Sequence, residues 1–183
     1  VTQSPRLPGR GKIPRRNVGA ATIFESMEIT NIFPRYDQAG QDLILKAYNI
    51  ASEALKGETR GNGQPFIEHP VAVAKIACDE IGLSAECIAA VFLHEATRFF
   101  PETDIRSAGF GKDVYTIVDG LNKISTIKPK DTRLEAELHK KLIVSYSRDP
   151  RVTVLKIADR LEVMRSLDMF PKLSRERKIL ETQ

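Results

Sequence analysis

Apolar residues recur at helical spacing along most of the chain beyond residue 40. The first such segment ends at Gly57 and has apolar residues three and four positions apart, namely Leu43, Ile44, Ala47, Ile50, Ala51, Ala54 and Leu55. The second begins at Pro70, which suits the first turn of a helix, and stops at Gly82. One-sided stripes of this kind predict two amphipathic helices, joined by a loop over residues 57–68.

Three further segments repeat the helical period. Ser84 is expected to cap a helix that has Glu86 near its positive end and that should end before Pro101. Residues 112–121 have the pattern of an amphipathic helix. The same holds for residues 134–147, with the apolar residues Leu134, Leu138, Leu142, Ile143 and Tyr146.

The segment after Pro150 is the most apolar helix expected in the chain. It contains Val152, Val154, Leu155, Ile157, Ala158, Leu161, Met164 and Leu167. Its opening is β-branched, but the segment is too long for one strand, so a buried helix is predicted. No alternating run bounded by hairpin turns occurs in the sequence. The chain is therefore expected to be an all-α bundle of six or seven helices.

The first 26 residues differ from the rest in composition. They hold three prolines, three glycines, five basic residues and one acidic residue, whereas residues 27–183 carry equal numbers of basic and acidic residues. Such a segment cannot offset its ordering entropy by burial, so residues 1–26 are expected to be a flexible basic leader. The leader is either an arm that binds phosphate groups or a non-native extension before a natural start at Met27. Residues 27–183 are expected to form one domain.

The cysteines and the hydropathy pattern indicate the cellular compartment in which the protein is expected. Cys78 and Cys87 are the only cysteines, and both stand in apolar stretches, which favours buried free thiols in a reducing compartment. No apolar run approaches the roughly 18 residues of a membrane-spanning helix. No secretion signal opens the chain. We therefore expect a cytoplasmic protein without a membrane partner.

Ionisable side chains stand at three places where burial is expected. His69 ends the loop before the second helix, His94 and Glu95 are neighbours in the third, and Asp159 interrupts the most apolar segment. Taken singly, each has a structural explanation, because Asp159 can pair with a nearby arginine and His94 can be a satisfied core histidine. Taken together, two imidazoles and two carboxylates form a donor set that suits manganese, iron or zinc better than calcium.

Four ordered motifs carry a resemblance to a known family. They are Arg60-Gly61-Asn62-Gly63-Gln64-Pro65-Phe66-Ile67-Glu68-His69-Pro70, Ala89-Ala90-Val91-Phe92-Leu93-His94-Glu95, Val118-Asp119-Gly120-Leu121-Asn122-Lys123 and Lys156-Ile157-Ala158-Asp159-Arg160-Leu161-Glu162-Val163-Met164-Arg165. Over about residues 41–180 the chain resembles the HD-type hydrolase domain of the RelA/SpoT family. That family makes and degrades the stringent-response nucleotides guanosine tetra- and pentaphosphate, (p)ppGpp. The resemblance implies a helical HD domain from the N-terminal part of such an enzyme.

The resemblance also implies a metal site. In active members two histidines and two aspartates hold Mn²⁺, and a metal-bound water attacks the 3′-pyrophosphate linkage. His69, His94 and Asp159 match three of these ligands, and Glu95 replaces the aspartate of the His-Asp pair. Glutamate keeps the charge but adds a methylene. That addition moves the carboxylate by more than the roughly 0.2 Å tolerance of metal–ligand distances unless its surroundings adjust.

A general base is missing from the position that the family implies. Active members place an adjacent Glu-Asp pair one turn after the His-Asp, where it orients and deprotonates the water, and this chain has Arg98-Phe99 there. Arginine stays protonated and phenylalanine has no ionisable group, so neither accepts a proton at neutral pH. Arg98 also brings a positive charge close to the expected cation.

The substrate contacts implied by the resemblance are altered as well. Arg60 matches the family's phosphate-binding arginine, and Phe66 replaces the tyrosine that follows the proline. The family's lysine, asparagine and His-Asn pair are replaced by Gly61, Leu138 and Glu162-Val163. Arg60, Phe66 and Glu162 remain as candidate contacts to a guanine alarmone nucleotide, which we expect to bind weakly.

Three functions stay open on the sequence alone. The first is an active Mn²⁺-dependent (p)ppGpp 3′-pyrophosphohydrolase, in which Glu95 is a ligand and another group, such as Glu162, replaces the base. The second, which we favour, is an inactive hydrolase domain kept as a regulatory module for a synthetase domain in a longer protein. The third is a protein whose basic leader binds nucleic acid or another anionic partner, although little besides five charges supports it.

The last residues of the chain support the second function. Leu173, Ile179 and Leu180 stand in a charged helical stretch, so their apolar face is expected to lack a partner within this chain. In the family, a synthetase domain that transfers pyrophosphate from ATP to GTP or GDP follows the hydrolase domain. No residue from Val1 to Gln183 matches that active site. We therefore expect the chain to be part of a longer protein.

Overall fold

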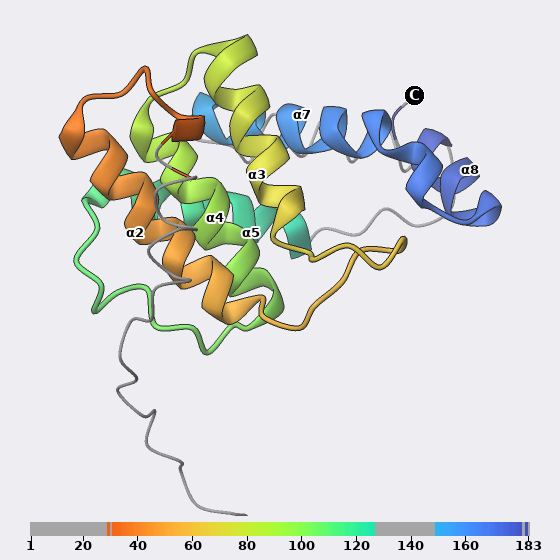
Figure 1. Cartoon of the computed structure of the whole chain (residues 1–183), viewed down its shortest axis with the longest axis horizontal. Helices are drawn as coiled ribbons and strands as arrows, with labels where there is room; N and C mark the ends of the chain where they lie inside the picture. Colours follow the sequence, from red (N-terminus) through yellow and green to blue (C-terminus); the bar gives the residue numbers. More distant parts are fainter. Residues whose placement is uncertain (1–28, 30, 127–148, 181, 183) are drawn as a thin grey trace, which may run out of the picture.

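The computed structural model describes residues 29, 31–126, 149–180 and 182. Its helical elements are α2 (Gln38–Ala54), α3 (Glu68–Lys75), the π-helical η1 (Ile76–Ile81), α4 (Ala85–Phe99), α5 (Lys112–Thr126), α7 (Pro150–Arg165), the 3₁₀ turn η2 (Leu167–Met169) and α8 (Lys172–Leu180). An isolated bridge between Thr59 and Pro65 is the only β pairing in this part of the chain. With six α-helices among the described residues, the predicted all-α bundle is confirmed (Figure 1).

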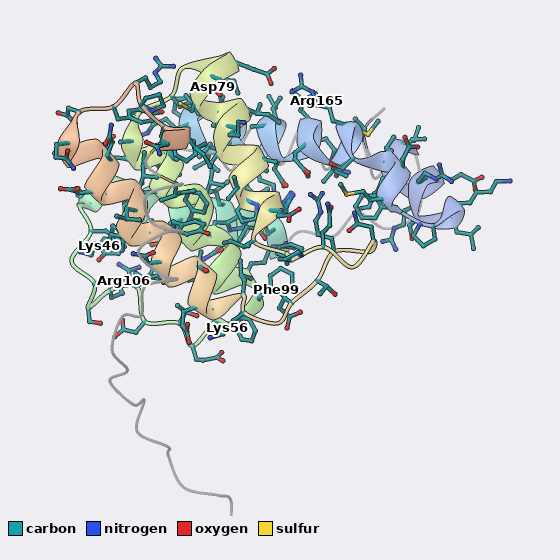
Figure 2. The ribbon with its side chains drawn as sticks, in the orientation of Figure 1. Lys46, Lys56, Asp79, Phe99, Arg106 and Arg165 are labelled. Atoms are coloured by element: carbon teal, nitrogen blue, oxygen red, sulfur yellow. The ribbon has the colours of Figure 1, made fainter. Side chains whose placement is uncertain are left out.

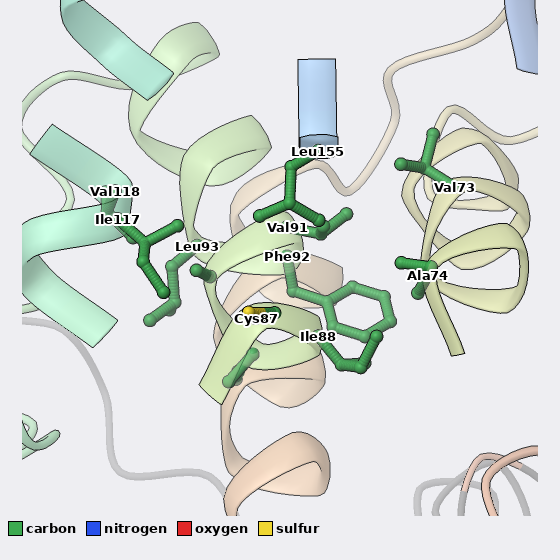
Figure 3. Close-up of a cluster of buried hydrophobic side chains, with 14 of the residues drawn as sticks. Val73, Ala74, Cys87, Ile88, Val91, Phe92, Leu93, Ile117, Val118 and Leu155 are labelled. Carbon is green, nitrogen blue, oxygen red and sulfur yellow. The ribbon is translucent and has the colours of Figure 1, made fainter. Parts of the chain in front are cut away.

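Helix α4 is the centre of the bundle. Helices α2, α3 and α5 pack against it, and α7 also contacts it. Figure 3 shows Ile117 of α5, Val73 of α3 and Leu155 of α7 converging on this helix. Every residue of α4 from Cys87 to Ala96 is buried, so a charged side chain in this stretch needs a partner inside the protein.

The first two helices have boundaries close to the predicted ones. Helix α2 begins three residues before position 41, because Asp37 caps it by accepting a hydrogen bond from the Gly40 N–H at 2.9 Å. Helix α3 begins two residues before Pro70 and continues through η1 to Gly82. Gly82 ends the helix with a φ of 80°, which glycine adopts without strain.

Ser84 stands at the N-cap position of α4, as predicted, but its hydroxyl does not cap the helix. The hydroxyl donates instead to the Cys87 sulfur at 3.7 Å. Cys87 and Cys78 are both buried free thiols, which confirms the interpretation of their apolar surroundings.

The prediction that the segment after Pro150 is helical is confirmed, but the prediction that this helix is buried is wrong. Val152, Leu155 and Ala158 of α7 are buried, whereas Ile157 is 60% exposed. The apolar residues of α7 lie on more than one face, and only one face meets the core. Helix α8 is similarly exposed, since Leu173 has an exposed fraction of 82%.

Two predictions fall outside the described residues. They are the flexible basic leader, residues 1–26, and the helix over residues 134–147 that includes Leu138. Both stay predictions. Where the structure is described, no helix is both long and apolar enough to cross a membrane.

Gly120 allows a close approach between α5 and α7. A Cβ at this position would lie 2.7 Å from Val152 Cγ2. Gly120→Ala is expected to lower the free energy of unfolding by about 1 kcal/mol, because overpacking costs about 1–3 kcal/mol and the better helix propensity of alanine returns about 1 kcal/mol at most. Urea unfolding followed by circular dichroism measures the change. Gly111→Ala is the matched control, since nothing lies within 4 Å of a Cβ there, and equal stability of the two variants would contradict the tight crossing.

Candidate metal centre

Three helices bring the predicted metal ligands to one junction. His69 lies in the first turn of α3, His94 and Glu95 lie in the buried stretch of α4, and Asp159 lies on α7. Helix α3 contacts both α4 and α7, and α4 contacts α7. His69, His94 and Glu95 are buried, whereas the side chain of Asp159 is 27% exposed. The four side chains therefore meet near the surface end of a buried cluster.

Three of these four residues form a group that could hold a metal ion. Donor atoms of His69, Glu95 and Asp159 lie within 4.8 Å of one another. Nitrogen and carboxylate donors together suit manganese, iron or zinc. His94 lies beside this group, because its Nδ1 is 2.7 Å from Asn122 Oδ1 and its Nε2 is 3.7 Å from Glu95 Oε1. Burial lowers the pKa of His94, so its imidazole is neutral at neutral pH.

His69 joins two carboxylates of α7. Its Nε2 lies 3.1 Å from Asp159 Oδ1, and its Nδ1 lies 2.6 Å from Glu162 Oε2. Burial alone would lower the pKa of His69, but these two hydrogen bonds outweigh it and raise the pKa to about 9. At neutral pH the imidazole therefore carries a proton on each nitrogen and donates to both carboxylates.

Asp159 has a second cation beside it. Lys156, one turn earlier on α7, donates to Asp159 Oδ2 at 2.8 Å. Burial would raise the pKa of Asp159, but His69 and Lys156 hold it well below its usual range. Arg165, one of the arginines close to Asp159 in the sequence, binds Glu80 of η1 instead.

Arg98 binds Glu95, the residue at the family's aspartate position. Its Nε and one terminal nitrogen lie 3.0 Å and 2.5 Å from Glu95 Oε2. The Arg98 guanidinium also lies 4.8 Å from the ring centre of Phe99 and 6.0 Å from that of Phe66, and these two rings pack 4.5 Å apart. Figure 2 shows Phe99 at the end of α4, near the loop that precedes α3. The position of the family's acidic pair thus holds a cation packed on aromatic rings.

The predicted substrate residues are engaged within the protein. The Arg60 side chain is 7% exposed and donates to Glu162 Oε1 at 2.7 Å. The Ser166 hydroxyl donates to the same oxygen at 2.7 Å. Burial would raise the pKa of Glu162, but His69, Ser166 and Arg60 together hold it below its usual value. Phe66 packs near the imidazole of His69, at 5.5 Å between ring centres.

Gly61 allows the loop before α3 to lie against η2. A Cβ at position 61 would be 3.2 Å from the carbonyl oxygen of Met169, which is tighter than ordinary contact. A lysine at position 61, as in the family, would therefore require the loop or η2 to shift.

Four side chains of the site were missed by sequence reasoning: Lys156, Ser166, Asn122 and Ser125. The first two had a usable signal, because Lys156 and Ser166 stand three and four positions from Asp159 and Glu162 on the same helix. Asn122 and Ser125 lie on α5 and approach His94 from another helix. No local spacing in the sequence shows a contact of that kind.

A small cavity lies at the junction, and its size shows how much room a divalent ion would have. Its volume is about 10 Å³, and its lining includes His94, Glu95, Lys156 and Asp159. This is room for about one water-sized particle. The donor types suit a metal, but Arg98 binds one carboxylate and Lys156 binds another. Each cation repels a divalent ion and takes up an oxygen that the ion would need. The donor atoms are therefore those that a metal prefers, but the neighbouring positive charges oppose its binding.

Comparisons with known proteins agree with the resemblance. The family model described as HD domain matches residues 47–183. The bifunctional (p)ppGpp synthase/hydrolase SpoT of Escherichia coli is 35% identical over 164 residues, which cover 87% of this chain and 23% of that protein. The guanosine-3′,5′-bis(diphosphate) 3′-pyrophosphohydrolase of Aquifex aeolicus is 34% identical over 168 residues, 90% of this chain and 23% of that protein. The probable GTP pyrophosphokinase of Mycobacterium leprae is 34% identical over 148 residues, 80% of this chain and 19% of that protein.

The matches cover most of this chain but a small part of each relative. The chain spans about a fifth of the length of these curated relatives. The matched part includes the central helices and all four motifs that carry the resemblance. The chain therefore belongs to the HD-domain family, as an HD domain of the RelA/SpoT type.

Proposed function

We propose that the hydrolase site of this HD domain is inactive and that the domain serves as a regulatory module for a synthetase domain in a longer stringent-response enzyme. The main support for this proposal is the ion pair between Arg98 and Glu95. Arg98 stands where active members have a general base, and an arginine stays protonated in proteins. Phe99 beside it cannot accept a proton either. Loss of a general base alone typically costs about 10²- to 10⁴-fold in rate.

The surroundings of the nucleotide contacts also support an inactive site. The guanidinium of Arg60 is buried and bound to Glu162, so its charge is already balanced within the protein. Phe66 packs on Phe99 and near His69, which leaves less of its ring for a guanine base. We therefore propose that a guanine alarmone nucleotide binds weakly.

Mn²⁺ is the metal that the resemblance to active members suggests. We propose that this chain does not hold it tightly, because Arg98 is bound to Glu95, and Lys156 and His69 are bound to Asp159. Removing these cations from the carboxylates would cost the free energy of the ion pairs before a metal ion could bind.

The grouping of His69, Glu95 and Asp159 within 4.8 Å favours a second candidate, an active metal-dependent hydrolase. This candidate needs a substitute base, and Glu162 is a carboxylate beside the group, with its Oε2 2.6 Å from His69 Nδ1. Glu162 accepts hydrogen bonds from Arg60, Ser166 and His69, and its pKa is lowered, so it is a poor proton acceptor. The inactive site is therefore the better supported function.

The regulatory part of the proposal rests on the exposed apolar side chains of α7 and α8. Ile157 is 60% exposed and Leu173 is 82% exposed, and both helices extend to one side of the bundle in Figure 1. Ile179 of α8 is exposed as well, and exposed apolar side chains that gather in one patch often mark a surface for another domain. Relatives named for pyrophosphokinase or synthase activity are much longer than this chain. We propose that a synthetase domain covers this surface.

In the longer protein, Ile157→Ser is expected to change the rate of pyrophosphate transfer from ATP to GTP or GDP. The substitution removes an exposed apolar contact and leaves the buried face of α7 intact. Lys56→Ser is the matched control, because its side chain is 78% exposed and lies away from α7 in Figure 2. Unchanged transfer in Ile157→Ser, with both variants folded by circular dichroism, would contradict the regulatory role.

A further inference from the structure

Arg98 occupies an unusual position for an arginine on a helix surface. Its side chain is 41% exposed, but the oxygen that it binds belongs to Glu95, whose side chain is 5% exposed. Two nitrogens of one guanidinium reach the same carboxylate oxygen. The guanidinium carbon lies 4.8 Å from the ring centre of Phe99 and 6.0 Å from that of Phe66. Arg98 thus delivers a fixed positive charge from the surface into the buried cluster.

Glu95 needs such a charge. It lies in the fully buried stretch of α4, and a buried carboxylate without a cation is costly. The neighbouring imidazole of His94 lies 3.7 Å away, beyond hydrogen-bonding distance. Among the described residues, Arg98 is the cation in ion-pair contact with Glu95, while the protonated imidazole of His69 lies farther away, within 4.8 Å.

We infer that Arg98 takes the place of the divalent metal as the counter-ion of Glu95, so that this site folds and stays closed without any metal. The inference deepens the proposed function and rests on it. A divalent ion would have to displace Arg98 from Glu95 Oε2, while Lys156 stays at 2.8 Å from Asp159. A built-in cation is present at every metal concentration, so the stability of the domain becomes independent of metal supply. Metal independence suits a domain that holds a partner rather than turns over a substrate.

Thermal unfolding of the whole chain, in EDTA and with excess Mn²⁺, tests the inference. The wild-type chain should unfold at the same temperature in both. Arg98→Gln should unfold roughly 5 °C lower in EDTA, because Glu95 loses its partner. Mn²⁺ should restore roughly this difference by binding the freed carboxylate. Arg98→Lys keeps the charge and should remain insensitive to Mn²⁺.

Arg106→Gln is the matched control for the loss of one arginine. Arg106 pairs with Asp119 at 3.0 Å and lies 5.1 Å from the ring centre of Tyr115, but it is 66% exposed and well apart from Phe99 in Figure 2. This variant should unfold at nearly the wild-type temperature, and Mn²⁺ should not change that temperature. A response equal to that of Arg98→Gln would contradict the inference.

If Arg98→Gln is too unstable to fold, the double variant Glu95→Gln with Arg98→Gln tests whether Arg98 is the counter-ion of Glu95. Removing both charges leaves no buried carboxylate uncompensated, so the double variant should fold in EDTA and show no response to Mn²⁺. A double variant that is as unstable as Arg98→Gln contradicts the inference. So does a wild-type chain that takes up one equivalent of Mn²⁺ in equilibrium dialysis.

Failure of this inference can be told apart from failure of the proposed function. Uptake of Mn²⁺ by the wild-type chain without release of pyrophosphate from guanosine tetraphosphate overturns the counter-ion role and leaves the inactive site standing. Release of pyrophosphate by the wild-type chain overturns the inactive site, and with it the inference that rests on it.

Discussion

Glu162→Ala is expected to lower the free energy of unfolding by about 3–5 kcal/mol, the cost of removing one partner from a buried ion pair. Glu162 is 3% exposed and joins the loop before α3, helix α3 and helix α7. Without its carboxylate, the guanidinium of Arg60 and one N–H of His69 lose their acceptor in a buried place. The Ser166 hydroxyl loses its acceptor too. Urea unfolding followed by circular dichroism measures the change.

The control for this variant is Glu53→Ala. Glu53 lies on α2 with an exposed fraction of 82% and forms only a 3.9 Å surface pair with Lys56. Its replacement should change the free energy of unfolding by less than about 0.5 kcal/mol. A loss in Glu162→Ala no larger than in Glu53→Ala would show that the Arg60–Glu162–His69 contacts do not hold the loop to the bundle.

The combined substitution Glu95→Asp, Arg98→Glu and Phe99→Asp is expected to create Mn²⁺-dependent hydrolysis of guanosine tetraphosphate. It introduces the acidic set that the family resemblance implies and removes the cation that binds Glu95. Restoring a general base should raise the rate by about 10²- to 10⁴-fold. The assay follows pyrophosphate release at high nucleotide concentration, because Arg60 stays bound to Glu162 and Gly61 supplies no charge.

The single variant Phe99→Asp separates the parts of this prediction. It adds a carboxylate but leaves Arg98 on Glu95, so no hydrolysis is expected. If the triple variant stays as inactive as Phe99→Asp while folding normally, the missing carboxylates are not the main defect. The altered nucleotide contacts would then account for the loss.

Much of the fold follows from local sequence signals. Pro70 and Gly82 mark the ends of α3 and η1 to within two residues, because one fits a first turn and the other a positive φ. The burial of α7 was overestimated, because apolar residues such as Ile157 lie on a face that the core does not reach. A period of 3.6 residues gives the faces of a helix but not which of them finds a neighbour.

The site residues that belong to the family motifs could be predicted from the sequence. Contacts between segments far apart in the sequence were harder to predict. His69, Glu95 and Asp159 were expected together, and the structure groups them. The contact of Arg98 with Glu95 follows from their spacing of three residues on one helix. The ion pair of Arg60 with Glu162 spans 102 positions, so it depends on the path of a loop that no local pattern describes.

We propose that this HD domain does not hydrolyse (p)ppGpp because Arg98 and Lys156 already bind the carboxylates of the site. The most direct test incubates the purified chain with guanosine tetraphosphate and Mn²⁺, follows pyrophosphate release, and measures the metal bound to the protein in parallel. We predict release at the rate of the protein-free control and far less than one Mn²⁺ per chain. Sustained turnover with one bound Mn²⁺ per chain would show that the hydrolase site is active.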